Sequence, residues 1–281
     1  MNRHRPDRCP GALRPWPADD GLLVRLRLPG GRVATSALAR LVGVAQEHGD
    51  GKVHVTTRTN LQVRAMPALP GTKVLPDEVL SALEGTGLLP SRAHELARNI
   101  MASPRTGVAG GRADLRPVVD ALDATICADP HLGRLPGRFL FVLDDGSGDL
   151  RNRSCDLGLV ALDPDRAQLR VGEGWGQVVP LVEAHLHLAG LARRFLQLRG
   201  RGREAPWHVR ELDIPLVEER LPHRDLPPPS PAPPYGSVTG GRHLPVPPEG
   251  LDHAAVAGLL DAAPTVVVTP WRGVFVPEET P

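Results

Sequence analysis

The stretch Val53-His54-Val55-Thr56-Thr57-Arg58-Thr59-Asn60-Leu61-Gln62-Val63 alternates between apolar or threonine residues and larger polar residues. Successive side chains of a β-strand point to opposite faces of a sheet. The pattern therefore predicts one strand over residues 53–63, with one polar face made of His54, Thr56, Arg58, Asn60 and Gln62. Residues 22–28 alternate in the same way and predict a second strand with Arg25 and Arg27 on one face.

If these two strands pair, one face of the sheet carries three arginines, an asparagine and a glutamine. Guanidinium groups bind carboxylates through paired hydrogen bonds, so such an array suits a large ligand that carries several carboxylates. The alternative is the ordinary solvated face of an antiparallel sheet. Composition favours binding, because Thr, Arg, Asn and Gln are poor choices for plain solubility compared with Lys and Glu.

Three segments resemble the sulfite and nitrite reductase family, whose members hold sirohaem next to a 4Fe-4S cluster. They are Arg25-Leu26-Arg27-Leu28-Pro29-Gly30-Gly31, Thr56-Thr57-Arg58-Thr59-Asn60-Leu61-Gln62 and Arg98-Asn99-Ile100-Met101-Ala102-Ser103-Pro104. Two further segments are similar to one branch of the family, precorrin-3B synthase of aerobic cobalamin synthesis. They are Arg8-Cys9-Pro10-Gly11-Ala12-Leu13 and Thr269-Pro270-Trp271-Arg272-Gly273-Val274.

The resemblance implies a set of tetrapyrrole-binding residues. The family arginine that matches Arg98 contacts the tetrapyrrole or the anionic substrate. Arg138 stands where the family usually has a lysine, and Leu140 stands at a second lysine position of the reductases, which argues against sulfite chemistry. We expect the carboxylates of a precorrin-type tetrapyrrole to be held by Arg25, Arg27, Arg58, Asn60, Gln62, Arg98, Asn99 and Arg138, with the first three arginines in one cleft with Arg98.

The iron–sulfur cluster of the family has no evident ligands in this sequence. A 4Fe-4S cluster needs four thiolates, whereas the chain has three widely spaced cysteines, Cys9, Cys127 and Cys155. In the family the cluster ligands lie in a further domain beyond the second half-domain. We therefore expect a family member that ends before its cluster domain. A split gene, a frameshift and a real loss of redox function all remain open, and no catalytic residue or metal site is assigned.

An internal repeat sets the expected organisation. A strand is also expected over residues 265–276, and its residues 266–276 match residues 53–63 without a gap, so that Thr269 corresponds to Thr56. Chance similarity of two β-α-β segments is the alternative. The expected fold is α+β, with two ferredoxin-like half-domains related by a pseudo-twofold axis and a central α+β domain. The expected domains are residues 1–89, a central domain at 90–221, a proline-rich linker at 222–234 and a second half-domain at 235–281.

Within the first half-domain, we expect helices over residues 35–47, capped by Thr35 or Ser36, and over residues 76–84. In the second half-domain, a helix is expected over residues 252–262. In the central domain, Asp114 is expected to cap a helix over residues 115–128. A three-stranded meander should follow, over residues 138–143, 156–162 and 168–171, and then a helix over residues 179–197. The glycine-rich segment 171–176 lacks the dinucleotide fingerprint spacing and is interpreted as a plain turn.

Composition excludes several functional classes. The formal net charge is +1, so no bulk attraction to nucleic acid or to a membrane surface is expected. The N-terminus predicts no signal peptide and no apolar run is long enough to span a membrane. The odd number of distant cysteines suits a reducing cytoplasm. His185 and His187 are two residues apart in an expected helix, which does not suit a metal pair.

These observations lead to one functional expectation and two alternatives. The expectation is a precorrin-3B synthase-like oxidoreductase that binds a polycarboxylate tetrapyrrole and lacks its iron–sulfur domain. The first alternative is a non-catalytic tetrapyrrole-binding protein, or a subunit that joins a separate cluster-bearing chain. The second is a fragment of a nitrite or sulfite reductase.

Overall fold

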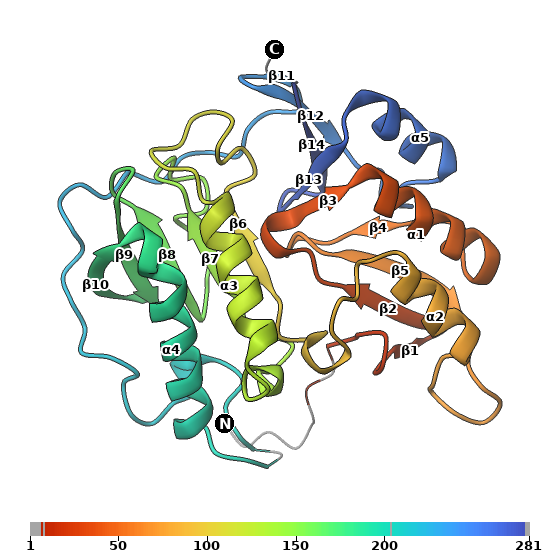
Figure 1. The fold of residues 1–281 in the computed structure, drawn as a ribbon, viewed down its shortest axis with the longest axis horizontal. Helices are drawn as coiled ribbons and strands as arrows, with labels where there is room; N and C mark the ends of the chain where they lie inside the picture. The colour runs from red at the N-terminus through yellow and green to blue at the C-terminus, as the bar shows by residue number, and fades with distance from the viewer. Residues whose placement is uncertain (1–6, 8, 203, 279–281) are drawn as a thin grey trace. The chain divides into compact units, whose positions relative to one another are not determined.

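A computed structural model describes residues 7, 9–202 and 204–278 (Figure 1). The chain forms two compact units. The half-domain unit comprises Cys9–Glu95 and the segment that starts at Pro233, and the central unit comprises Leu96–Ala232 together with Asp7. Each has a hydrophobic core of its own. No helix in the described part of the chain is long and apolar enough to cross a membrane.

The first half-domain is a four-stranded antiparallel sheet covered by two helices. Its strand order is β1-β2-β5-β4, and α1 and α2 lie on the same side of it (Figure 1). The bounds are β1 Trp16–Ala18, β2 Gly21–Leu26, β4 His54–Val55, β5 Leu61–Met66, α1 Thr35–His48 and α2 Asp77–Gly85.

The second half-domain repeats the strand order of the first. Its sheet is ordered β11-β12-β14-β13, with β3 added next to β13. The bounds are β3 Arg32–Ala34, β11 Gly236–Val238, β12 Gly241–Pro245, β13 Thr265–Thr269, β14 Gly273–Pro277 and α5 His253–Ala262.

The predicted single strand over residues 53–63 is wrong, because the chain reverses direction inside it. β4 and β5 pair with each other as an antiparallel hairpin, with His54 opposite Gln62. The Thr56 hydroxyl accepts a hydrogen bond from the Asn60 N–H at 3.1 Å, and Thr59 adopts a left-handed backbone with φ 56°. The apolar alternation continues through this tight turn, which contains no glycine or proline, so the period of two did not reveal it.

The predicted strand over residues 265–276 is also a hairpin, and it repeats the first hairpin residue by residue. The Thr269 hydroxyl accepts from the Gly273 N–H at 3.2 Å, as that of Thr56 does from Asn60. Arg272 has φ 60°, matching Thr59. Thr56 and Thr269 therefore occupy equivalent positions, and the predicted repeat is confirmed.

The two half-domains exchange strand pairing reciprocally. Val33, just before α1, pairs with Val266 of the second hairpin. Leu251, just before α5, pairs with Val53 of the first hairpin. Each half-domain therefore extends the other's sheet, as a pseudo-twofold arrangement requires, and the expected α+β fold with two ferredoxin-like half-domains is confirmed.

Neither of the two expected helix caps is present, and a cap that was not expected is found at a third helix. Thr35 is the first residue of α1 and its hydroxyl donates to the Ala263 carbonyl at 2.8 Å, so neither it nor Ser36 caps the helix. Asp114 accepts from the Arg116 N–H, but α3 begins at Arg116 without a side-chain cap. Asp252 does cap α5, because its carboxylate accepts from the Ala255 N–H at 2.9 Å.

The central unit is a five-stranded mixed sheet, ordered β10-β9-β8-β7-β6, and α3 and α4 cover one face of it (Figure 1). The bounds are β6 Ile100–Ala102, β7 Phe141–Asp144, β8 Leu157–Ala161, β9 Arg166–Val171, β10 Gly174–Pro180, α3 Arg116–Ala128 and α4 Ala184–Leu198. The core between sheet and helices includes the fully buried Phe139, Phe141 and Phe195.

Two predictions for the central unit are wrong. β7 and β8 run parallel, so the segment that begins at Asp145 is a crossover and not a meander turn. Residues 174–180 form β10, paired with β9, and the helix predicted from residue 179 begins only at Ala184. Of the plain turn expected at residues 171–176, only Gly172 and Glu173 form the tight end of this hairpin, and Gly172 has φ 59°.

Replacing Thr269 by valine should destabilise the half-domain unit. Thr269 is completely buried, and its hydroxyl contacts both the Gly273 N–H and His243 Nε2, the latter at 3.0 Å. Valine leaves both groups without this partner, which should cost about 1–3 kcal/mol. Urea unfolding should show the loss, and the exposed Thr57→Val should serve as a control within about 0.5 kcal/mol of the parent. Equal stability of the two variants would contradict the role assigned to the Thr269 hydroxyl.

Candidate functional site

The pairing of β2 with β5 places Arg25 opposite Gln62. Leu22, Val24 and Leu26 alternate with Arg25 and are buried in the core. The Arg25 side chain therefore lies on the other face, where its Nη2 donates to Gln62 Oε1 at 3.2 Å. The predicted pairing of these two residues on one sheet face is confirmed.

Arg27 follows β2 directly and is 3% exposed. Its Nη1 donates to the Pro10 carbonyl at 3.1 Å and to the Arg25 carbonyl at 3.2 Å. Its Nε and Nη2 are buried without a hydrogen-bond partner. A buried donor that lacks an acceptor is costly, so Arg27 presents two strong donors that an anion would satisfy.

Electrostatics link Arg27 to the neighbouring arginines. Burial first of all, and then repulsion by Arg25 and Arg58, lower the pKa of Arg27 to about 10, while Cys9 and Glu95 act in the opposite direction. With a pKa of about 10, the Arg27 guanidinium still keeps its proton at neutral pH. The three arginines therefore concentrate positive charge at this end of the first half-domain.

The turn between β4 and β5 carries Arg58 and Asn60. Arg58 is half-buried near the tip. Asn60 is 2% exposed and its Oδ1 accepts from the Leu28 N–H at 3.1 Å, so its amide oxygen fastens the turn to the end of β2. The arrangement gives Asn60 a positioning role for Arg58, and direct contact of Asn60 with a ligand stays a prediction.

Sequence reasoning missed the loop that closes over Arg27. Glu95 is 8% exposed, and its carboxylate accepts from the backbone N–H groups of Ala12, at 2.5 Å, and Leu13. Burial raises the pKa of Glu95, and these backbone bonds and Arg27 oppose the rise. Glu95 thus holds residues 10–13 in place, and with them the Pro10 carbonyl that Arg27 contacts. No sequence pattern marks this lone glutamate, because its partners are backbone groups far away in the chain.

Arg98 and Asn99 belong to the central unit and have structural partners there. Arg98 Nε and Nη2 each lie 2.7 Å from a carboxylate oxygen of Asp123 on α3. Asn99 Nδ2 donates to the Phe139 carbonyl at 3.1 Å. These contacts fix the start of β6 against α3. Their proposed contact with a tetrapyrrole, and the predicted common cleft of Arg98 with Arg25, Arg27 and Arg58, stay predictions.

Arg138 is exposed in the central unit, at the position where the resemblance implied a lysine. Its guanidinium carbon lies 5.2 Å from the ring centroid of Trp207. Stacking of this kind orients a flat cation and suits arginine better than lysine. The substitution at this position thus has a local structural reason, and ligand contact by Arg138 stays a prediction.

The three cysteines do not make a cluster site. Cys9 is buried in the half-domain unit, whereas Cys127 lies on α3 and Cys155 precedes β8. Burial raises the pKa of Cys127 and raises that of Cys155 to about 12, so both are thiols at neutral pH. Cluster ligands are thiolates, and the described residues do not fit a 4Fe-4S cluster.

One acidic group was not expected from the sequence. Asp144, Asp145 and Asp149 each offer an oxygen atom, and these atoms lie within 4.8 Å of one another. Asp144 accepts from the backbone N–H groups of Gly146, Gly148 and Leu150, so it shapes the β7–β8 crossover. Burial raises the pKa of Asp149 to about 7, although Ser103 donates to it at 2.7 Å. This group has the ligand types for a cation, but a carboxyl that holds its proton near neutral pH is a weak ligand.

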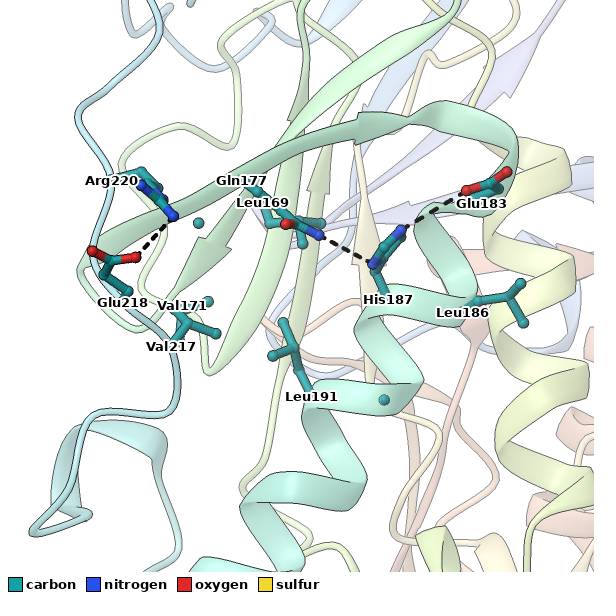
Figure 2. Close-up of a pocket in the computed structure, with 12 residues that line it drawn as sticks. Leu169, Val171, Gln177, Glu183, Leu186, His187, Leu191, Val217, Glu218 and Arg220 are labelled. Atoms are coloured by element: carbon teal, nitrogen blue, oxygen red, sulfur yellow. Dashed lines mark hydrogen bonds and ion pairs between the residues drawn. The ribbon is translucent and has the colours of Figure 1, made fainter.

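A cavity of about 600 Å³ lies in the central unit beside β10 and α4 (Figure 2). Its wall has aliphatic residues, among them Leu169, Leu186 and Leu191, and polar or charged residues as well. His187 approaches Gln177 at 3.4 Å and Glu183 at 4.0 Å, so its polar contacts lie along the cavity wall. His187 thus contacts its own helix start and β10, in line with the structural role expected of it.

Two comparisons with known proteins bear on this arrangement. Residues 17–68 match the nitrite/sulfite reductase ferredoxin-like half domain. This match contains β2, both strands of the first hairpin and four residues of the arginine site, Arg25, Arg27, Arg58 and Gln62. No curated protein matches the chain.

A solved structure shares the fold over nearly the whole chain. The NirA protein of Mycobacterium tuberculosis superposes with a TM-score of 0.68 at 17% identity, over 93% of this chain and 56% of the NirA chain. The protein described here therefore corresponds to little more than half of NirA, and the shared fold is nitrite/sulfite reductase-like. The arginine site lies in the part of that fold that the half-domain family also matches.

Replacing Asp149 by asparagine should change how stability depends on pH. The folded pKa of about 7 lies above the ordinary aspartate value of about 3.9. The folded state therefore holds a proton that the unfolded state releases, and stability decreases as pH rises from about 4 to about 7. Asp149→Asn should remove this decrease and raise the free energy of unfolding at pH 8 by up to about 4 kcal/mol.

Urea unfolding at pH 5 and pH 8 measures this difference. The matched control is Asp163→Asn, because Asp163 is exposed and Arg166 lowers its pKa. A parent and an Asp149→Asn variant with the same dependence on pH would contradict the assignment.

Proposed function

We propose that the first half-domain binds a polycarboxylate tetrapyrrole, and that the chain acts as a precorrin-3B synthase-like member of the sirohaem oxidoreductases. The observation that supports this proposal most directly is Arg27. It is a buried cation with two unsatisfied donor atoms, and it lies close enough to Arg25 and Arg58 for their charges to lower its pKa. A ligand with several carboxylates supplies both the missing acceptors and the missing negative charge.

Each group at this site has a distinct part in the proposal. Arg25, oriented by Gln62, and Arg58, at the tip of the hairpin, would grip separate carboxylates. Arg27 would bind a carboxylate through Nε and Nη2 while Nη1 stays on the Pro10 carbonyl. Asn60 and Glu95 position the turn and the loop. Sirohaem, when bound, would supply a redox-active iron, and no residue of this chain is assigned a catalytic step.

The precorrin-3B synthase branch is preferred over a nitrite or sulfite reductase on two residues. Leu140 is 6% exposed and packed in the central unit, where the reductases have a second lysine. Arg138 stacks on Trp207 at the first lysine position. A site with fewer cations is less suited to a small anionic substrate than to a tetrapyrrole, which is held by its side-chain carboxylates.

Removal of Arg58 should weaken tetrapyrrole binding. A charged hydrogen bond contributes roughly 1.5–3 kcal/mol, so Arg58→Ala should weaken a uroporphyrin-type ligand by about ten- to a hundredfold. Quenching of tryptophan fluorescence measures the affinity. The control is Arg166→Ala, because Arg166 is exposed and pairs locally with Asp163 at 2.7 Å. Equal affinities of the two variants would mean that the arginine face is an ordinary solvated sheet surface.

The isolated chain should not assemble a stoichiometric 4Fe-4S cluster. Its three cysteines lie on separate elements, and two of them have raised pKa values. Anaerobic reconstitution with iron and sulfide should therefore leave less than one cluster per chain. A stable four-iron cluster on the monomer would refute this expectation.

The alternatives differ in what the purified protein carries. A non-catalytic binder, or a subunit that joins a separate cluster-bearing chain, is favoured by the lack of a fitting cluster site among the described cysteines. An ultraviolet–visible spectrum separates the cases. Sirohaem bands would favour a redox enzyme or a reductase fragment, and a corrin-precursor spectrum would favour a binder.

A further inference from the structure

A second group of arginines lies in the central unit, at the C-terminal end of α4. Arg193 belongs to the last turns of this helix, and Arg201 lies just beyond its end. Arg134 belongs to the 3-10 turn Leu132–Arg134, between α3 and β7. All three arginines are exposed, and together they line a cavity of about 450 Å³.

The cavity has an excess of positive charge. Asp129 is the one carboxylate among its described lining residues. Asp129 Oδ2 accepts a hydrogen bond from Arg193 Nε at 2.5 Å, and Oδ1 accepts one from the His131 N–H at 2.8 Å. Arg193 therefore already neutralises this carboxylate. Arg134 and Arg201 have no other carboxylate to pair with among the described residues of the cavity wall.

Arg199 adds a further cation, next to Gly200 of the cavity wall. Its Nε donates to the Pro206 carbonyl at 2.7 Å. Burial lowers the pKa of Arg199 and repulsion by Arg134 lowers it as well, while Asp7 opposes both effects. The repulsion means that two guanidinium groups of like charge lie near each other. An anion bound beside them relieves this repulsion.

The end of α4 accounts for only part of this cluster. Carbonyl groups at the C-terminal end of a helix favour nearby cations, and Arg193 and Arg199 are placed to benefit from them. Arg134 lies on a different segment, so the helix end does not explain its presence. The same carbonyl groups repel an anion, and anion binding in the cavity must therefore come from the arginines themselves.

We propose that this cavity binds a diphosphate group. Arg134 and Arg201 bind its oxygens, and Arg199 adds positive charge nearby. A diphosphate carries about three negative charges at neutral pH, which matches the three arginines that remain beside the pair of Arg193 and Asp129. Guanidinium groups bind phosphate oxygens through paired hydrogen bonds. A tetrapyrrole is less suitable, because its carboxylates are spread around a wide ring and not gathered in one small space.

Isothermal titration calorimetry of the full chain with pyrophosphate, in a buffer without divalent cations, tests this proposal. The parent should show saturable binding that weakens as salt is added, because exposed charges are screened. Arg134→Ala and Arg201→Ala should each weaken binding about five- to tenfold. ADP serves as a second probe for the source of the diphosphate. Tighter binding of ADP than of pyrophosphate would support a nucleotide, and equal or weaker binding would support free diphosphate.

Arg194→Ala is the matched control. Arg194 is the exposed neighbour of Arg193 on the same helix and is not among the residues that line the cavity. Its replacement removes the same charge from the protein, and the affinity for pyrophosphate should equal that of the parent.

Asp129→Asn tests the proposal in the opposite direction. Asparagine keeps an oxygen for the His131 N–H but releases Arg193 from its carboxylate, so pyrophosphate should bind about fivefold more tightly. A gain in affinity does not arise from a variant that fails to fold.

Three results would overturn the proposal. One is no binding of pyrophosphate to the parent. Another is the same loss of affinity in Arg194→Ala as in Arg134→Ala, which would reduce the effect to bulk charge. The third is loss of pyrophosphate binding in Arg58→Ala, which would place the anion at the arginine site of the first half-domain. Arg134→Ala should leave the affinity for uroporphyrin unchanged, so this proposal and the proposed function are tested separately.

Discussion

Reciprocal strand exchange between the half-domains is the constraint on which the rest of the half-domain unit depends. Val33 pairs with Val266 and Leu251 pairs with Val53, so each hairpin gains a strand or bridge from the other copy. All four residues are in one core, although Val53 and Val266 are more than two hundred residues apart in the chain. Folding of the first half-domain therefore depends on the last part of the sequence, and the long central unit is inserted between two halves of one structure.

The arginine site is built on this frame and is closed by a buried carboxylate. Arg27 is 3% exposed, and the loop above it is held through Glu95. Without a bound anion such a site lowers the stability of the fold, because burial and repulsion by neighbouring arginines both act on the Arg27 guanidinium. The half-domain family match covers most of these arginines, whereas the fold match spans only 56% of the larger NirA chain. Binding of a polycarboxylate can therefore be tested on this chain alone.

Internal symmetry makes the differences between the copies as informative as their similarity. Thr59 and Arg272 share an unusual left-handed backbone, which shows that turn geometry is kept where side chains differ. Val24 and Arg242 share a register position but not an environment, because Val24 is completely buried whereas Arg242 is exposed.

The sequence by itself determined the repeat, the helices and the pairing of Arg25 with Gln62. These features rest on local periodicity and on side chains that share a face, and both are properties of neighbouring residues. Only the tertiary structure decided the two hairpin turns, the parallel pairing of β7 with β8, and the contact of Glu95 with residues 12 and 13. The first turn contains no glycine or proline to mark it, although the second contains Pro270 and ends at Gly273. The parallel strands need a crossover that local patterns do not specify, and Glu95 bonds to backbone groups that every sequence has.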